Sequence, residues 1–196
     1  MMEYPNMFEI LRKNIPPYLC QGDLFLRFGG NILPPVSPKE VGFMVLNYDC
    51  DLINQKELNY ICICPIFNIE VLLKIYVQES LKINPEKSKK NITNQIVKNM
   101  DNLFNNKKKY YFFLSPINEF NDTPSFADLL RIYTLPINYL NDIFKSRVKV
   151  LKHPWREKLG WKVSYIFHRV ALPDIDEEKA QKYVINHDIV KRLLPE

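Results

Sequence analysis

Two apolar stretches on either side of a polar turn make up residues 41–67, VGFMVLNYDCDLINQKELNYICICPIF. Apolar runs with few interruptions are typical of strands that are buried on both faces. Polar residues separate the two runs, so we expect an antiparallel pair of strands over residues 42–48 and 59–66, with a turn at residues 54–57. This strand pair is expected to form the centre of the fold.

The flanking sequence adds helices and shorter strands. Apolar residues spaced three and four apart predict helices, and short apolar or alternating runs between turn residues predict strands. Helices are expected over residues 7–13, 68–83, 92–104 and 153–173 and from residue 176, and a short helix or a turn over residues 136–144. Strands are expected over residues 24–28, 110–114, 126–135 and 147–151. We therefore predict a single α+β domain over residues 1–196. Its core is expected at about residues 20–84 plus the later strands, and its C-terminal part, about residues 152–196, is expected to be helical.

The composition indicates a folded core and places the basic charge late in the chain. Hydrophobic residues make up 46% of the 196 residues and aromatic residues 13%, which excludes extensive disorder. The formal net charge is +5. Residues 86–196 carry 20 Lys and Arg against 13 Asp and Glu, whereas residues 1–85 carry 7 against 9. An anionic partner is therefore expected on the second half of the chain.

Membrane insertion, secretion and metal binding are not expected. No apolar run reaches the roughly 20 residues that a membrane-spanning helix needs, and the N-terminal MMEYPNMFEILRK lacks the basic start and apolar centre of a secretory signal. Four cysteines do not make a disulfide framework in a chain of this length, and the spacing of Cys62 and Cys64 fits a strand face better than a zinc site. We expect a cytoplasmic protein with reduced thiols and with no membrane association, metal or cofactor.

Three short motifs stand in a recognisable order. Gly22-Asp23 opens the first expected strand, residues 43–46 form an apolar strand after a long loop, and residues 61–66 end in Cys-Pro-Ile. In this order they resemble the MazF/PemK-like family of prokaryotic toxin–antitoxin proteins. The resemblance implies a small SH3-like antiparallel β-barrel with packed α-helices. Similarity to a divergent branch of longer members rests on Cys50-Asp51 and on residues 154–159 and 169–173.

The resemblance also implies a function. Active family members are sequence-specific endoribonucleases that work without metal, with an arginine from the loop between the first two strands and a Thr or Ser directly after Pro-Ile. In this chain the loop at residues 29–40 contains Lys39 and no arginine, and Phe67 follows Pro65-Ile66. Stabilisation of a transition state needs hydrogen-bond donors that are already in place. We therefore expect a MazF-like protein with a degenerate nuclease site, which acts as a binding or regulatory component of a prokaryotic stress or antiviral defence system.

For a MazF-like protein with a degenerate nuclease site, we expect a protein partner, either antitoxin-like or a signalling component. Two alternatives stay open. The first is a sequence-specific endoribonuclease toxin, an mRNA interferase, with an altered active site. The second is a nucleic-acid-binding regulator that uses residues 145–169, where eight Lys and Arg accompany one acidic residue. RNA is the substrate in the first alternative and a possible ligand in the second.

Asp49, Cys50, Asp51 and Arg156 are the candidate catalytic residues. A thiol nucleophile or a pair of carboxylates is the functional interpretation of the Asp-Cys-Asp cluster. If the preceding strand continues through this cluster, Cys50 points away from the two aspartates. No histidine that could act as a base is close in sequence. In the alternative interpretation, the thiol belongs to the core and the carboxylates cap backbone amides at the turn.

A candidate binding surface lies on the basic helix of the second half. Lys158, Lys162, Tyr165 and Arg169 are spaced four, three and four residues apart, so they form one line along a helix, and Trp161 flanks it. Lysines beside aromatic rings suit a nucleic-acid strand, because the ammonium groups bind phosphates and the rings stack on bases. A solvated helix face and a docking face for an acidic protein are the alternatives.

Overall fold

The computed structural model describes residues 4–9, 17–28, 33, 39–54, 58–83 and 89–167. The chain divides into two units, Met1–Ile166 and Phe167–Glu196. The elements below belong to the first unit, apart from Phe167 at the end of the last described helix. The helix that we expect from residue 176 lies outside the described residues, and the single domain over residues 1–196 stays a prediction.

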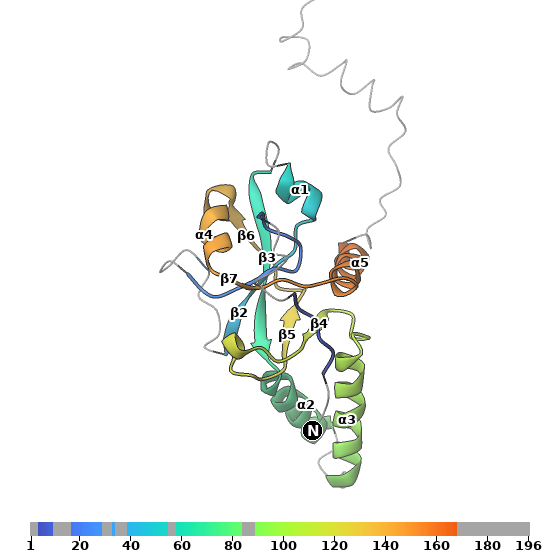
Figure 1. The fold of residues 1–196 in the computed structure, drawn as a ribbon. Helices are drawn as coiled ribbons and strands as arrows, with labels where there is room; N and C mark the ends of the chain where they lie inside the picture. Colours follow the sequence, from blue (N-terminus) through green and yellow to red (C-terminus); the bar gives the residue numbers. More distant parts are fainter. Residues whose placement is uncertain are drawn as a thin grey trace, which may run out of the picture. The chain divides into compact units, whose positions relative to one another are not determined.

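Figure 1 shows the strands and helices of the described residues and labels most of them. The strands are β1 (Leu24–Phe25), β2 (Glu40–Val45), β3 (Tyr60–Asn68), β4 (Tyr111–Leu114), β5 (Ser125–Asp128), β6 (Tyr133–Pro136) and β7 (Arg147–Lys149). The α-helices are α1 (Asp49–Ile53), α2 (Glu70–Ile83), α3 (Lys89–Phe104), α4 (Leu140–Lys145) and α5 (Trp155–Phe167). Short 3-10 turns occupy Asn118–Phe120 and Ile137–Tyr139.

Strand β3 is the centre of a seven-stranded antiparallel sheet. Strand β2 pairs with one edge of β3, and β6 and β5 follow one another along the other edge. The full order is β4–β5–β3–β2–β1–β7, with β6 beside β3. The α+β class and the central strand pair are therefore confirmed. Within the described residues the end strands do not pair with each other, so the sheet is open and the predicted barrel is not shown.

The polar segment after β2 forms helix α1 instead of continuing the strand. The backbone N–H groups of Asp51 and Leu52 both donate to the Tyr48 carbonyl oxygen, at 3.1 Å each. Leu52 is buried, which holds the helix against the sheet. The predicted strand over residues 42–48 is therefore too long at its end. Asp49 and Cys50 lie on a helix, so the expected alternation across a strand is wrong.

The strand expected over residues 126–135 is two strands with a reversal between them. The Asp128 side chain accepts a hydrogen bond from the N–H of Leu130 at 3.1 Å, and its carbonyl oxygen accepts one from Arg131 at 3.2 Å. Such local bonds of an aspartate to the backbone favour a turn over a continuing strand. The reversal lets β5 and β6 occupy successive parts of the same edge of β3.

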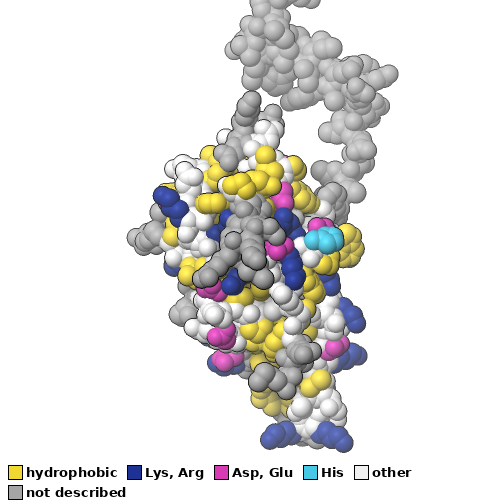
Figure 2. Space-filling view, in the orientation of Figure 1, with side chains coloured by type: hydrophobic (Ala, Val, Ile, Leu, Met, Phe, Trp, Pro, Cys, Tyr) yellow, Lys and Arg dark blue, Asp and Glu magenta, His cyan; other side chains and the backbone are white. Residues whose placement is uncertain are grey.

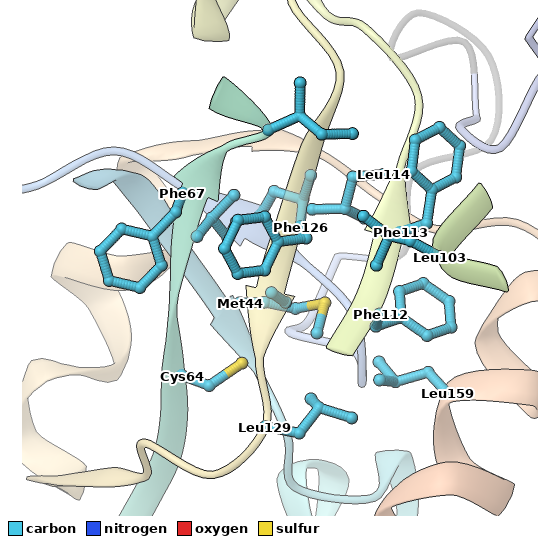
Figure 3. Packing of buried hydrophobic residues seen from close by; sticks show 14 of the residues in the cluster. Met44, Cys64, Phe67, Leu103, Phe112, Phe113, Leu114, Phe126, Leu129 and Leu159 are labelled. Carbon is cyan, nitrogen blue, oxygen red and sulfur yellow. The ribbon is translucent and has the colours of Figure 1, made fainter. Parts of the chain in front are cut away.

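Side chains are buried on both faces of the central strands, as their apolar runs predict. Figure 3 shows the first cluster, in which Met44 of β2 and Cys64 of β3 lie near phenylalanines of β4 and β5. Leu103 and Leu159 reach this cluster from α3 and α5 (Figure 3). The second cluster is built on the alternate residues of β2 and β3 and includes Phe25, Phe43, Val45, Leu52, Ile61, Ile63 and Ile143.

The N-terminal segment is extended where it is described. Phe8 forms a β-bridge with Leu151, and the Ser115 hydroxyl donates to the Pro5 carbonyl oxygen at 2.6 Å. The segment is thus attached both to the residues after β7 and to those after β4. The helix expected over residues 7–13 is wrong for its first three residues, and the rest of it lies outside the described residues.

Candidate functional site

Helix α5 presents two stacked aromatic rings to solvent. Trp161 and Tyr165 are four residues apart, so their side chains lie on the same face of the helix. Their ring centroids are 5.8 Å apart with an angle of 13° between the planes, and 68% of Trp161 and 45% of Tyr165 are exposed. Leu159 and Val163 on the opposite side are buried in the core and anchor the helix. The stack therefore projects from a fixed element.

Two lysines accompany the stack. The Lys109 ammonium, from the turn before β4, lies 5.6 Å from the Tyr165 ring centroid and 4.6 Å from that of Tyr110. Lys158 lies about one helical turn before Trp161. Its ammonium is 5.3 Å from the Trp155 ring centroid. We call Lys109, Lys158, Trp161 and Tyr165 the α5 surface. Figure 2 shows Lys and Arg side chains along the edge of the molecule that α5 and α3 form.

Lys162 does not belong to this surface, although the helical line predicts that it does. Only 5% of the residue is exposed, and its ammonium donates to the carbonyl oxygens of Lys108, at 2.6 Å, and of Tyr111. The Asn106 side-chain oxygen lies 3.5 Å away. Burial, with a smaller contribution from the Lys158 charge, lowers the pKa of Lys162 to about 8. No carboxylate is among these contacts, so the ammonium is held by uncharged oxygens, two of them backbone carbonyls.

The buried ammonium explains how the α5 surface is assembled. Asn106 adopts a left-handed backbone conformation, with φ of 55°, and its side-chain oxygen accepts the Phe113 N–H at 2.8 Å. By bonding to this turn, Lys162 attaches the turn to α5 and brings Lys109 next to Tyr165. The role of Lys162 is therefore to position the surface. Arg169, the last residue of the predicted line, lies outside the described residues.

Asp49 and Arg156 are the two candidate catalytic residues that the structure brings together. The Arg156 guanidinium is 3.2 Å from one oxygen of the Asp49 carboxylate, and the other oxygen accepts the Gln21 N–H at 2.6 Å. Arg156 also donates twice to the Leu151 carbonyl oxygen, at 2.8 and 3.2 Å. Both side chains are thus occupied by bonds that join α1, α5 and the turn before β1. This arrangement is a structural tie between three segments.

Cys50 and Asp51 face away from that tie. Both are exposed, with the Cys50 sulfur 3.6 Å from an Asp51 carboxylate oxygen, and they line a hollow of about 440 Å³ with Asn54 and Leu58. His153, the histidine of the described chain, pairs instead with Glu157 at 2.9 Å. The Asp-Cys-Asp cluster therefore has no contact with an imidazole base in the described residues. In the same residues, no group of three or more His, Cys, Asp or Glu side chains is placed to hold a metal ion.

The position after Pro65-Ile66 is apolar and buried. The Phe67 ring lies beside that of Phe126 (Figure 3), and the two ring centroids are 5.8 Å apart. The Arg131 guanidinium lies 5.5 Å from the Phe67 ring centroid and pairs with Asp128 at 3.1 Å. Lys39, Phe67 and Arg131 line a small hollow of about 160 Å³ with neighbouring side chains. No sequence signal connects Arg131 to Phe67, because the turn that places it is visible only in the fold.

The Gly22-Asp23 motif has a structural explanation. Gly22 has φ of +83°, which favours glycine, and its N–H donates to the Val45 carbonyl oxygen at 2.8 Å. Asp23 is completely buried and pairs with Arg147 of β7 at 2.9 Å. Burial raises the pKa of Asp23 to about 6, although the Arg147 guanidinium acts to lower it. The motif thus fixes β1 between β2 and β7.

Comparison of the chain with protein-family models, with curated proteins and with solved structures found no match. No helix in the described residues combines the length and the hydropathy needed to cross a membrane. What the chain binds is therefore inferred from the geometry of the candidate sites.

Proposed function

We propose that this protein binds single-stranded RNA on the α5 surface and does not cleave it. The observation that carries the proposal is the stacked, solvent-exposed pair Trp161 and Tyr165, with Lys109 beside Tyr165 and Lys158 about one helical turn before Trp161 on the same helix. Aromatic rings supply stacking platforms for bases, and the lysines supply phosphate contacts. The proposal is the nucleic-acid-binding alternative that the sequence of residues 145–169 suggested, with two changes. Lys109 is added to the binding surface, and Lys162 positions that surface instead of contacting RNA.

The energetics of the exposed rings support a binding role. A large aromatic ring at the surface keeps apolar area in water, and covering that area with a base is favourable. Each base–aromatic stack contributes about 1–3 kcal/mol to binding. The two rings lie on a helix whose other side is anchored in the core, so little side-chain order has to be acquired on binding.

Cleavage is not supported at the positions that could carry it. Phe67 has no group that transfers a proton, and Arg131 beside it is paired with Asp128. All three nitrogens of the Arg156 guanidinium donate to Asp49 or to the Leu151 carbonyl oxygen. General acid–base chemistry requires a titratable group within reach of the substrate, and transition-state stabilisation requires donors aimed at the developing charge. The proposal therefore retains the biological context that the MazF-like resemblance implies, which is a prokaryotic stress or antiviral defence system. It does not retain the RNA cleavage that the toxins of that family catalyse.

Binding of a fluorescein-labelled uridine-rich RNA of 10 to 20 nucleotides, followed by fluorescence anisotropy, tests the proposal. Trp161→Ala and Tyr165→Ala should each weaken binding about five- to 140-fold, which corresponds to about 1–3 kcal/mol. Tyr60→Ala is the matched control, because it removes a ring with 56% exposure from β3 and should leave affinity unchanged. Two lysine–phosphate contacts predict that log K falls with log salt with a slope of about −1.4.

Three outcomes would overturn the proposal. Absence of RNA binding by the wild-type protein would reject RNA as the ligand and favour a protein partner for the same face. An equal loss in the Tyr60→Ala control would reject the α5 surface as the site. Specific cleavage products in a metal-free reaction, seen on a denaturing gel, would favour the endoribonuclease alternative.

A further inference from the structure

A hollow beside helix α5 is lined mainly by aromatic rings. Its volume is about 350 Å³, and its walls include Tyr4, Phe104, Phe113 and Trp155, with Lys158 at its edge. The rings come from four separate segments: the N-terminal extension, α3, β4 and the first turn of α5. The sequence patterns do not predict that these rings meet, and binding on the α5 surface does not require it.

The rings form a defined receptor and not a random apolar patch. Phe104 and Phe113 meet edge to face with centroids 5.1 Å apart, and Tyr4 lies 6.2 Å from Phe104 and 6.1 Å from Phe113. Phe113 is buried, so it forms the floor, whereas Tyr4, Phe104 and Trp155 are only partly buried. The Lys158 ammonium lies above Trp155 and donates to the Asn105 carbonyl oxygen at 3.4 Å. A flat π-system would find ring faces and ring edges here, next to a positive charge.

We propose that this hollow receives one nucleobase of the single strand that the α5 surface binds. The inference rests on the proposed function and adds a base-binding subsite to it. The volume is at the lower end of the range for small-molecule pockets, which suits one base and its sugar. The positive charge of Lys158 at the edge complements the phosphate that is attached to such a base.

The hollow and the stacked rings both include side chains of helix α5. Trp155 and Trp161 are six residues apart, which is about 9 Å along the helix axis at 1.5 Å per residue. Lys158 lies halfway between them, so a phosphate that it binds is within reach of both. One strand can therefore place a base in the hollow and further bases on Trp161 and Tyr165.

The hollow is expected to accept different bases. The Asn105 side-chain amide, which could otherwise contact a base edge, donates to the Asp101 carbonyl and carboxylate oxygens at 3.0 and 2.9 Å. Stacking on rings tolerates any base because every base has a π-face. The subsite thus contributes affinity and register to the bound strand without base-edge readout.

Abasic scanning tests the inference. The probe is the shortest oligouridine that the full-length protein binds with full affinity, so that the strand has no room to slide. A series of such probes carries one abasic nucleotide at successive positions. With wild-type protein, an abasic nucleotide at the position that enters the hollow should weaken binding about five- to 140-fold. In Trp155→Ala this loss should disappear, while the loss at the positions that stack on Trp161 stays.

Tyr4→Ala is the second variant, because Trp155→Ala could also disturb the start of α5. Thermal melting of both variants shows whether they fold, and Trp161→Ala is the matched variant, which should remove the loss at a different nucleotide position. If no position of the scan depends on Trp155 or Tyr4 while the oligouridine still binds, the subsite is rejected and the proposed function stands. If no oligouridine binds to the wild-type protein, both are rejected.

Discussion

The Lys162→Met variant is expected to lose stability and to keep most of its RNA affinity, whereas Lys158→Met is expected to do the reverse. The sequence spacing predicts that both lysines lie on the basic face of α5. In the structure, Lys162 is the one of the two whose ammonium is buried and bonds to Lys108 and Tyr111. Methionine has a similar length and no charge, so it removes these hydrogen bonds without leaving a large cavity.

The expected loss can be worked out from the contacts. Two hydrogen bonds from a charged donor to carbonyl oxygens contribute about 1.5–3 kcal/mol each, or about 4.5 kcal/mol together at mid-range. The pKa of Lys162 falls from 10.5 to about 8, which corresponds to about 3 kcal/mol of opposing desolvation cost. The net loss in Lys162→Met is therefore about 1.5 kcal/mol at neutral pH. Urea unfolding of the two variants beside the wild type measures it.

The pH dependence of stability checks the same interaction. Because the pKa of Lys162 is lower in the folded protein, the unfolded chain holds a proton between pH 8 and 10.5 that the folded protein has released. The free energy of unfolding should therefore rise with pH through this window, by up to about 3 kcal/mol relative to Lys162→Met. Unchanged stability of Lys162→Met, together with a salt slope reduced by about 0.7, would refute the reasoning and return Lys162 to the binding surface.

Three further predictions concern Asp23, Gly22 and Arg156, which hold β1, α1 and α5 in place. Because burial raises the pKa of Asp23 to about 6 from 3.8, the folded protein holds a proton that the unfolded chain loses, and stability should fall by up to about 3 kcal/mol as pH rises from about 4 to 6. Asp23→Asn should lack this fall in denaturant titrations at each pH, and a parallel fall in the variant would contradict the assignment. Gly22→Ala places a Cβ 2.6 Å from a buried Leu151 methyl at φ of +83°, so about 2 kcal/mol or more should be lost in urea unfolding. Arg156→Met removes the bonds to Asp49 and Leu151 and should cost about 1–2 kcal/mol by thermal melting without changing RNA affinity; a selective loss of RNA binding or of a nuclease activity would show that Arg156 belongs to a site.

The central strands could be predicted because burial on both faces leaves a plain apolar pattern. The two runs on either side of the turn become β2 and β3, and Asn68 accepts the Glu70 N–H at 2.9 Å at the start of α2, as a capping residue should. Helix α1 and the division into β5 and β6 were missed, because both depend on local bonds to Tyr48 and Asp128 that a hydrophobic pattern does not reveal.

The candidate site could be predicted only in part. The spacing of Trp161 and Tyr165 places them on one helix face, and the structure confirms that they are exposed. The same spacing could not show that Lys162 turns inward, because its backbone partners are the carbonyl oxygens of Lys108 and Tyr111, some 50 residues earlier in the chain. The meeting of Asp49 with Arg156 likewise depends on the packing of α5 against α1.

Ultraviolet cross-linking to a 4-thiouridine-containing single-stranded RNA, followed by peptide mass spectrometry, tests the central claim most directly. The account predicts that the RNA stays intact and that it cross-links to Trp161 and Tyr165. A further cross-link on Trp155 is expected from the base that occupies the hollow. Cross-links confined to the neighbourhood of Lys39 and Arg131, or shortened RNA in the absence of metal, would contradict it.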